Sequence, residues 1–323
     1  MDTQMKDIKQ AWVLTGGGGN GAFQAGAMKW LYDEGYRPDL VVGVSVGALN
    51  GLAIACDRIN LMSQLWYTIK DEDVYRKRGL FGLGIRQLLS KIRLSSAPSS
   101  IYDHSPLRKY LEQHVKGWVI QKTLIIKTVD IERGDVLQHK FVEGREVDDE
   151  VINAVMAASA IPVIFEPQVI KVDSIIYNEN TNELQYRKLS DAGVRQIAPL
   201  KTITSLHKAD SSWFCQKVNS VVVISCSPYN DIAKEKINNL QDTAKRSIEL
   251  LIRSVLISDI KEYQLKNRLA EHETNYTYFP TAVIAPDQDL GGSLDFDQTL
   301  NRSRFQKGAK AASEEMSNND EFV

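Results

Sequence analysis

The sequence predicts an α/β fold with a mainly parallel central sheet. Two strand–glycine turn–helix units follow one another within the first sixty residues, which is the alternation expected of such a sheet. Farther along, residues 220–226 form a continuous apolar run of the kind found in strands that are covered on both faces. These observations place the first two strands and a later buried strand in one sheet.

The first unit begins with a short apolar strand at residues 11–15 and ends in a helix at residues 22–31. Gly16–Gly21 joins them and reads G-G-G-G-N-G, which presents backbone N–H groups at a helix start, where an anion binds well. A phosphate would fit a P-loop, but the G-K-[S/T] ending is absent. A dinucleotide needs an acidic residue about 20 positions on, and Asp39 lies near that distance. A third candidate for the anion bound by this loop is an oxyanion, formed on a carbonyl group that lies beside the second unit.

The second unit contains the main candidate for chemistry. Residues 39–44 form a β-branched strand, Gly43–Gly47 reads G-V-S-V-G, and small residues continue the helix at 47–56. This is the pattern of a nucleophile elbow, in which Ser45 stands at the apex of a tight turn. An ordinary strand-to-helix turn is the alternative interpretation, because glycine and serine are common turn residues.

The remaining elements follow from apolar periodicity and turn residues. We predict helices at residues 59–69, from Ser105 onward with Pro106 in the first turn, and at 148–158, 238–270 and 299–316. We predict strands at residues 122–131, 138–142, 169–172, 175–177, 184–189 and 279–285. The strands at 122–131 and 138–142 should pair across the turn at Glu132–Asp135.

Residues 80–94 combine apolar and basic side chains at roughly helical spacing. This pattern suits peripheral contact with an anionic membrane or a lid over an apolar site. An amphipathic helix that packs on the sheet and exposes a basic face to solvent is the favoured alternative.

Composition narrows the class of protein. The 323 residues are 43% hydrophobic and 25% charged, with a net charge of −2, so no global charge attracts nucleic acid. The three cysteines are scattered and predict neither a disulfide framework nor a zinc site. With no signal peptide and no apolar run of about 20 residues, we expect a cytoplasmic protein. We expect a polar N-terminal extension at 1–10, one domain at 11–310 and a polar C-terminal tail at 311–323.

A base for Ser45 is needed, because a serine hydroxyl is a weak nucleophile. Of the five histidines, the late ones, His207 and His272, do not follow a late strand, as the histidine of a Ser–His–Asp hydrolase would. Asp191 stands after a strand and before small residues. Taken alone, this pattern predicts an Asx turn, in which the aspartate side chain accepts a hydrogen bond from its own backbone. Because the carboxyl ends of parallel strands share one edge, we expect Asp191, Ser45 and the glycine loop on the same rim.

Three ordered motifs resemble those of the patatin-like phospholipases, a family of serine–aspartate lipid acyl hydrolases. Gly16–Gly21 is similar to its oxyanion loop, Gly43–Gly47 to its elbow, and Asp191–Gly193 to its D-G-[G/A] motif. The stretches Ala154–Phe165 and His104–Leu107 are also similar to family segments.

The resemblance implies a three-layer α/β/α fold and assigns roles to residues. It implies that Ser45 is the nucleophile, that Asp191 is the general base, and that no metal or cofactor is used. The implied oxyanion donors are the N–H groups of Gly17, Gly18 and Gly19, and the implied supporting glycines are Gly16, Gly21, Gly43, Gly47 and Gly193. The sequence departs from the family at Asn20, where a basic residue is usual, and at Ala192, where D-A-G replaces D-G-[G/A].

We therefore predict a phospholipase A-type lipid acyl hydrolase that acts through an acyl-enzyme on membrane or storage lipids. The expected partner is an acyl lipid, with phospholipid favoured, and no nucleic acid is expected. Two alternatives remain open at this point. They are a Ser–His–Asp esterase for small soluble esters, and a non-catalytic module that binds an anion or an acyl group.

Overall fold

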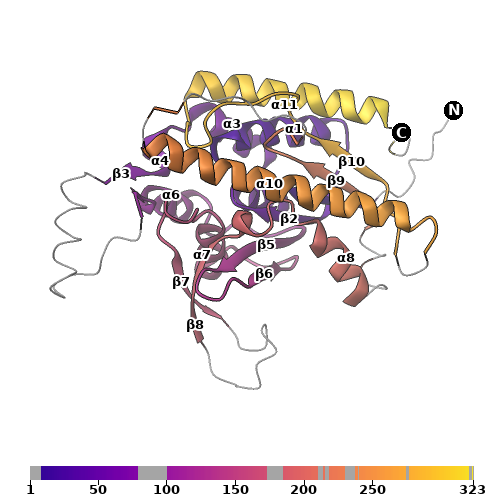
Figure 1. Cartoon of the computed structure of the whole chain (residues 1–323), viewed down its shortest axis with the longest axis horizontal. Coiled ribbons are helices and arrows are strands. Elements are labelled where there is room, and N and C mark those ends of the chain that lie inside the picture. Colours follow the sequence, from indigo (N-terminus) through magenta and orange to yellow (C-terminus); the bar gives the residue numbers. More distant parts are fainter. Residues whose placement is uncertain are drawn as a thin grey trace.

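A computed structural model describes residues 9–78, 100–172, 185–209, 214, 218–229, 237–238, 240–273, 276–319 and 322. The chain forms a mixed α/β fold in which helices flank an eight-stranded, mostly parallel sheet (Figure 1). The strand order is β10-β9-β1-β2-β5-β8-β7, and β6 pairs with β5. This confirms the predicted fold class.

The parallel part of the sheet consists of five strands that all run in the same direction. They are β10 (Thr281–Ile284), β9 (Ser220–Ile224), β1 (Gln10–Leu14), β2 (Pro38–Val44) and β5 (Thr123–Asp130). Their carboxyl ends lie in register, with Leu14 opposite both Gly43 and Ile224. The segments that follow β1, β2 and β9 therefore meet at one edge, where sites form in such sheets.

The other part of the sheet is antiparallel. It contains β6 (Val136–Phe141), β7 (Gln168–Val172) and β8 (Gln185–Asp191). β6 pairs with β5 across a tight turn, as expected, whereas β8 pairs antiparallel with the last residues of β5, with Asp191 opposite Thr128. The expectation that Asp191 ends a parallel strand is therefore wrong. β5 runs beyond the parallel strands, and β8 returns along this extension to the same edge.

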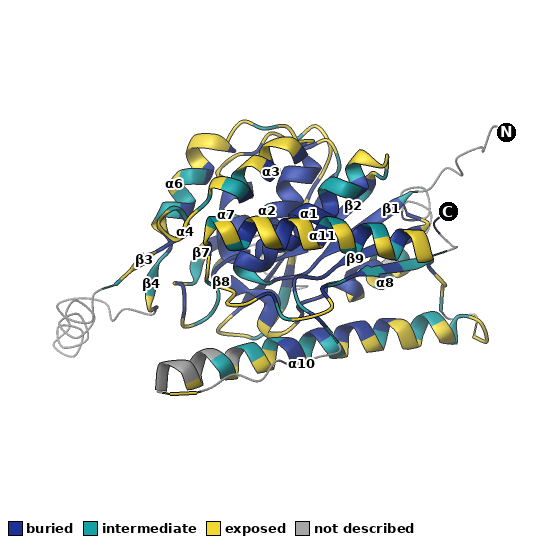
Figure 2. Cartoon of the chain, turned by 90° about the horizontal axis from the view of Figure 1, so that it is seen from above, coloured by how far each residue is buried: buried dark blue, intermediate teal, exposed yellow. Residues whose placement is uncertain are grey.

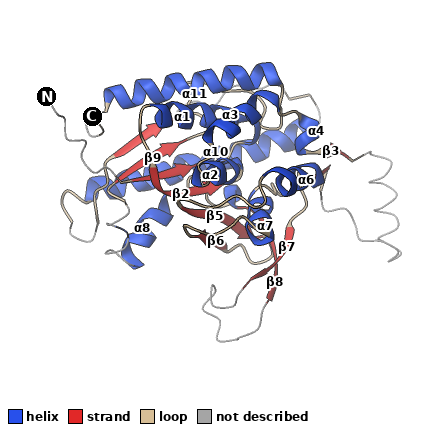
Figure 3. Ribbon diagram, turned by 180° about the vertical axis from the view of Figure 1, so that it is seen from behind, coloured by secondary structure: helices blue, strands red, loops and turns tan. Residues whose placement is uncertain are grey.

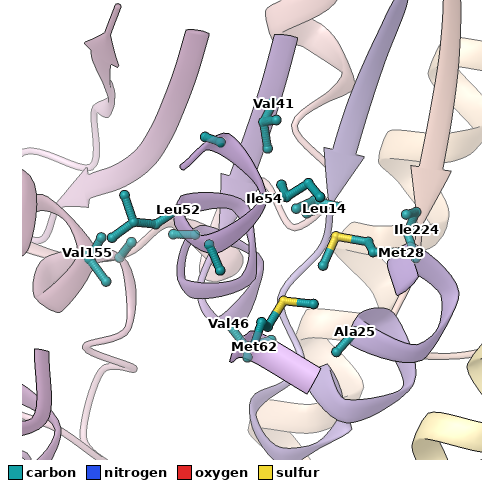
Figure 4. Packing of buried hydrophobic residues seen from close by; sticks show 14 of the residues in the cluster. Leu14, Ala25, Met28, Val41, Val46, Leu52, Ile54, Met62, Val155 and Ile224 are labelled. Carbon is teal, nitrogen blue, oxygen red and sulfur yellow. The ribbon is translucent and has the colours of Figure 1, made fainter. Parts of the chain in front are cut away.

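Each face of the sheet has its own hydrophobic core, because successive strand residues point to opposite faces. Trp12 and Leu14 of β1 belong to one cluster, and Ala11 and Val13 to the other. Figure 4 shows part of the larger cluster, where Leu14 and Ile224 from the sheet meet Met28 from a covering helix.

The larger cluster lies under most of the helices, which stand in front of the sheet in Figure 3. They are α1 (Gly21–Asp33), α2 (Val46–Ala55), α3 (Ile59–Thr68), α6 (Ser105–His114), α7 (Asp149–Ala158) and α11 (Gln298–Asn318). The smaller cluster is covered by α8 (Leu200–Ala209) and by the 30-residue α10 (Leu240–Leu269), which forms a separate layer in Figure 2. The short α4 (Asp71–Val74) leads into the two-stranded ribbon of β3 (Arg76–Lys77) and β4 (Tyr102–Asp103).

The C-terminal boundary differs from the expected one at residue 310. α11 continues to Asn318, and Ala312 and Met316 lie in the core that it shares with α1. Phe322 is also buried. The polar residues after 310 belong to the exposed face of an amphipathic helix, so polarity alone did not distinguish it from a tail.

Two other expectations concern membranes. Among the described residues, no helix is both long and apolar enough to cross a bilayer. The basic segment at residues 80–94 lies outside the described residues, so its membrane contact stays a prediction.

Candidate active site

Ser45 lies at a sharp turn between β2 and α2. Its φ and ψ angles are 56° and −130°, a conformation that residues with side chains seldom adopt. The Ala48 N–H donates to the Ser45 carbonyl at 2.9 Å and closes the first turn of α2. Ser45 therefore has the strained geometry of a nucleophile elbow, at the positive end of a helix.

The elbow packs directly against the end of β1. A Cβ atom on Gly47 would overlap the carbonyl oxygens of Leu14 and Thr15, so only glycine allows this approach. The same contact holds Ser45 next to the glycine loop, since the Cβ position of Gly16 lies 2.9 Å from Ser45 Cβ. The glycine loop and the elbow, which are well separated in the chain, thus form one surface.

Asp191 reaches this surface from the antiparallel side. Its backbone N–H donates to the Ala160 carbonyl at 2.9 Å, and the Ser190 hydroxyl donates to the same oxygen. Its carboxyl group accepts a hydrogen bond from the Gly193 N–H at 2.7 Å, and it lies close enough to the Ser45 hydroxyl to interact with it. The Ala160 carbonyl belongs to one of the family-like segments noted in the sequence, which gives that segment a structural role.

Burial raises the pKa of the Asp191 carboxyl from 3.8 to about 6, while the nearby Ser45 hydroxyl and the Gly193 N–H oppose the rise. Desolvation destabilises the carboxylate, and the two donors restore part of that loss. A carboxyl group with a pKa near 6 is ionised at neutral pH and still basic enough to accept a proton.

The glycine loop lies beside this pair and is held by two other segments. The Gly17 Cβ position falls against Cys226, which follows β9, and Gly18 has a φ of 55°. The Gly19 N–H donates to the carbonyl of Ser293 at 2.6 Å. Among the described residues, no backbone acceptor takes the Gly17 or Gly18 N–H, so we narrow the proposed oxyanion donors to these two.

Two cavities, each of about 340 Å³, meet at Ser45. The first, here called the apolar cavity, extends between α2, α3 and α6 and is lined by side chains such as Leu52, Met62 and Trp66. The second, here called the mixed cavity, contains Asp191 together with Lys77 and Arg253. Gly18 and Leu294 border both cavities. This arrangement suits a substrate with one long apolar part and one more polar part.

Comparison with known proteins places the chain in a family. Residues 12–202, more than half of the chain, match the patatin-like phospholipase family. The chain belongs to the patatin-like phospholipase family. No curated protein matches the sequence. Family membership supports lipid ester hydrolysis as the general activity of this patatin-like chain.

The fold resembles two solved structures at low identity. One is VipD from Legionella pneumophila, with 13% identity and a TM-score of 0.40, covering 97% of this chain and 67% of VipD. The other is the heterodimeric complex ExoU–SpcU from the type III secretion system of Pseudomonas aeruginosa. It has 12% identity and a TM-score of 0.33, and the match covers 97% of this chain and 52% of that chain. This chain thus spans about two thirds and about half of those chains, and both likenesses are too distant to assign residue roles.

All five histidines of the patatin-like chain are described, and four of them do not line a cavity that contains Ser45. His139 hydrogen-bonds to Thr128 at 2.9 Å, and His207 packs edge-on against Phe214 and Phe279. His272 is exposed beyond α10, and neither it nor His207 lines a cavity that contains Ser45.

His104 is the histidine that shares a cavity with Ser45. Its ring stacks on Phe165 with 4.0 Å between the centroids, which joins the two family-like segments. Burial lowers its pKa to about 3, so the ring stays neutral at physiological pH. The stacking position gives His104 a packing role, and this arrangement does not favour the Ser–His–Asp alternative.

A buried polar network beneath the glycine loop was not predicted. Asn50 donates to the Gly21 carbonyl and to Gln24 Oε1, both at 3.0 Å, and accepts from the Trp66 indole at 2.9 Å. Gln24 in turn donates to the Ile224 carbonyl at 2.9 Å. Each polar atom here finds a partner, so the network fixes α1, α2 and α3 around the end of the loop at Gly21.

Asn20, the departure from the family pattern, lies buried at the wall of the mixed cavity. Its Oδ1 atom has no hydrogen-bond partner among the described residues. Sequence reasoning also missed the segment Leu290–Phe296, which crosses the glycine loop and contributes to both cavities. Its glycines and polar residues read as an ordinary loop, and nothing local indicates what it contacts.

Proposed function

We propose that this chain is a lipid acyl hydrolase in which Ser45 and Asp191 form the catalytic dyad. The observation that carries the proposal is the position of the Asp191 carboxyl beside the Ser45 hydroxyl, in the mixed cavity that both residues line. A base in contact with a strained, apical serine is the arrangement that nucleophilic catalysis needs. The family match supports a lipid ester as the substrate.

The first half of the reaction forms an acyl-enzyme. Asp191 accepts the Ser45 proton while Ser45 Oγ attacks the ester carbonyl carbon, and the carbonyl oxygen becomes an oxyanion. The N–H groups of Gly17 and Gly18 bind this oxyanion; in other enzymes one such donor contributes about 3 to 4 kcal/mol. The tetrahedral intermediate collapses, the C–O bond to the alcohol breaks, and Asp191 returns the proton to the leaving oxygen.

The second half releases the fatty acid. Asp191 takes a proton from water, the hydroxide attacks the acyl carbonyl, and Ser45 Oγ leaves with the proton that Asp191 gives back. The apolar cavity receives the acyl chain, because its lining is mostly hydrophobic. The mixed cavity, with Lys77 and Arg253, receives the alcohol part of the lipid.

Fatty acid release from lipid vesicles tests the proposal, with Ser45→Ala and Asp191→Asn as the test variants. We expect each to lose activity by about 10³-fold or more, as when a member of a catalytic unit is removed. Asp259→Asn is a matched control: burial also raises the pKa of Asp259 to about 6, and its carboxyl accepts the N–H groups of Ile197 and Ala198 instead of the Ser45 hydroxyl.

We expect the control variant to retain activity within about threefold, since the Asp259 carboxyl binds the backbone of Ile197 and Ala198 and not the reacting atoms. Full activity in Ser45→Ala or Asp191→Asn would overturn the dyad. A panel of phospholipid, galactolipid and triacylglycerol vesicles defines the substrate class. Binding without release from any of them would favour the non-catalytic alternative.

A further inference from the structure

The segment Leu290–Phe296, here called the strap, lies across the outer face of the glycine loop. The Ser293 carbonyl accepts the Gly19 N–H at 2.6 Å. A Cβ atom on Gly18 or Gly19 would overlap the carbonyl oxygens of Ser293 or Asp295, so strap and loop are in direct backbone contact. The strap lies beyond the residues that match the family, so this contact belongs to the rest of the chain.

One side chain holds the strap in place. Arg304, on α11, is only 1% exposed, and its guanidinium donates to three strap carbonyls: Leu290 at 3.1 Å, Gly292 at 3.0 Å and Asp295 at 2.7 Å. A planar group with donors in a fixed fork sets the relative positions of the acceptors that it binds. The Cβ position of Gly19 lies 3.0 Å from Arg304 Nη1, so the cation is directly behind the loop.

Among the described residues, no carboxylate forms a close ion pair with Arg304, and Asp295, Asp289 and Asp297 act on its charge from farther away. Within the described part of the chain, no Asp or Glu oxygen lies within 4.0 Å of its guanidinium, and its remaining hydrogen bond goes to Asn301 Oδ1. Asp289, the acidic residue at the start of this region, forms its ion pair with Arg253. A buried positive charge acts strongly on a nearby developing anion, because little water screens it.

Four successive glycines have many accessible conformations, so an oxyanion loop made of them needs an external tether. We propose that Arg304 is a positioning residue for the hydrolysis. It fixes the strap, the Ser293 carbonyl then orients the peptide between Gly18 and Gly19, and the N–H groups of Gly17 and Gly18 are held toward the oxyanion. The inference rests on the proposed function and adds to it a residue from the C-terminal helix.

The test compares Arg304→Gln and Arg304→Lys with wild type on a short soluble ester. Preorganised donors act on the transition state, so the change should fall on kcat and leave KM within about twofold. We expect kcat to fall by about 100-fold in Arg304→Gln, comparable to the loss of one oxyanion donor, and by about tenfold in Arg304→Lys, which keeps the charge and loses the fork. Arg302→Gln, an exposed neighbour on α11, should equal wild type.

kcat is calculated per active site, counted by complete labelling with a fluorophosphonate, so that unfolded protein does not enter the value. The midpoint of the acidic limb of the pH profile should stay near 6, because Arg304 acts on the loop and not on Asp191. An unchanged kcat in Arg304→Gln, or a change confined to KM, would overturn the inference. Loss of activity in Ser45→Ala together with full activity in Arg304→Gln would leave the proposed function intact and refute only the positioning role of Arg304.

A second variant tests the strap without touching Arg304. Tyr75, the residue after α4, donates its hydroxyl to the Leu294 carbonyl of the strap at 2.9 Å. Tyr75→Phe removes this single bond and should lower kcat by about fivefold with KM unchanged, as expected for a neutral hydrogen bond. Because both residues act through the strap, the double variant Arg304→Lys/Tyr75→Phe should lower kcat by less than the product of the two single-variant decreases. Independent effects, or none, would contradict the role of the strap.

Discussion

The parallel and the antiparallel parts of the sheet each contribute one member of the proposed dyad, and they hold it in different ways. On the parallel side, Ser45 is fixed by backbone packing, with Gly47 against the end of β1. On the antiparallel side, Asp191 is fixed by hydrogen bonds from its own turn and to Ala160. Substitutions on the first side should therefore affect folding, and those on the second should affect ionisation.

The largest expected effect is on the parallel side, at Gly47. A Cβ atom there meets two backbone carbonyls that cannot move away, so we expect Gly47→Ala to lower the free energy of unfolding by about 3 kcal/mol. Gly51→Ala is the matched control in the same helix, since its Cβ atom would meet only side-chain atoms, at 3.1 Å and beyond. We expect the control to remain within about 1 kcal/mol of wild type. Urea unfolding measures both, and equal values would contradict the packing account.

The second prediction concerns the antiparallel side. Folding raises the pKa of Asp191 from 3.8 to about 6, so between these values the folded state binds more protons than the unfolded state. The stability of wild type therefore falls as pH rises through this window, and Asp191→Asn escapes the loss. We expect the stability of the variant relative to wild type to increase by about 2 to 3 kcal/mol between pH 4 and pH 8.

Thermal or urea unfolding across that pH range measures the difference. Asp259 is present in both proteins, so the effect of its own raised pKa on stability cancels in the difference between them. A constant difference between variant and wild type would show that Asp191 does not ionise in this window.

The smallest expected effect is at the histidines. His207→Ala, His272→Ala and His104→Phe should each keep kcat/KM within about threefold, because none of these rings acts on the proton of Ser45 and His104→Phe preserves the stack on Phe165. The measurement is hydrolysis of a short soluble ester at pH 8. A loss of 100-fold or more in any of them would revive the Ser–His–Asp alternative.

The two sides also differ in how well the sequence predicts them. Gly43–Gly47 and Gly16–Gly21 are local patterns in which the residue types dictate the turn, and the predicted strands and helices around them agree with the structure within a few residues. The sequence predicts Asp191 as the partner of Ser45 but places it after a parallel strand, whereas β8 runs antiparallel along the end of β5. Strand direction depends on pairing between distant segments, which no local pattern contains.

The strap and Arg304 illustrate the limit more clearly. A buried arginine on an amphipathic helix has the same sequence pattern as an exposed one, and only tertiary contact reveals that it binds three carbonyls near the glycine loop. The same holds for Gly19, whose N–H was predicted to bind the oxyanion and instead donates to Ser293.

The pH dependence of kcat/KM for ester hydrolysis tests the dyad most directly. Only ionised Asp191 accepts the Ser45 proton, so activity of wild type should fall about tenfold between pH 8 and pH 5, with a midpoint near 6. The residual activity of Asp191→Asn should have no transition at this pH. The same transition in that variant would assign the titrating base to another residue and contradict the account.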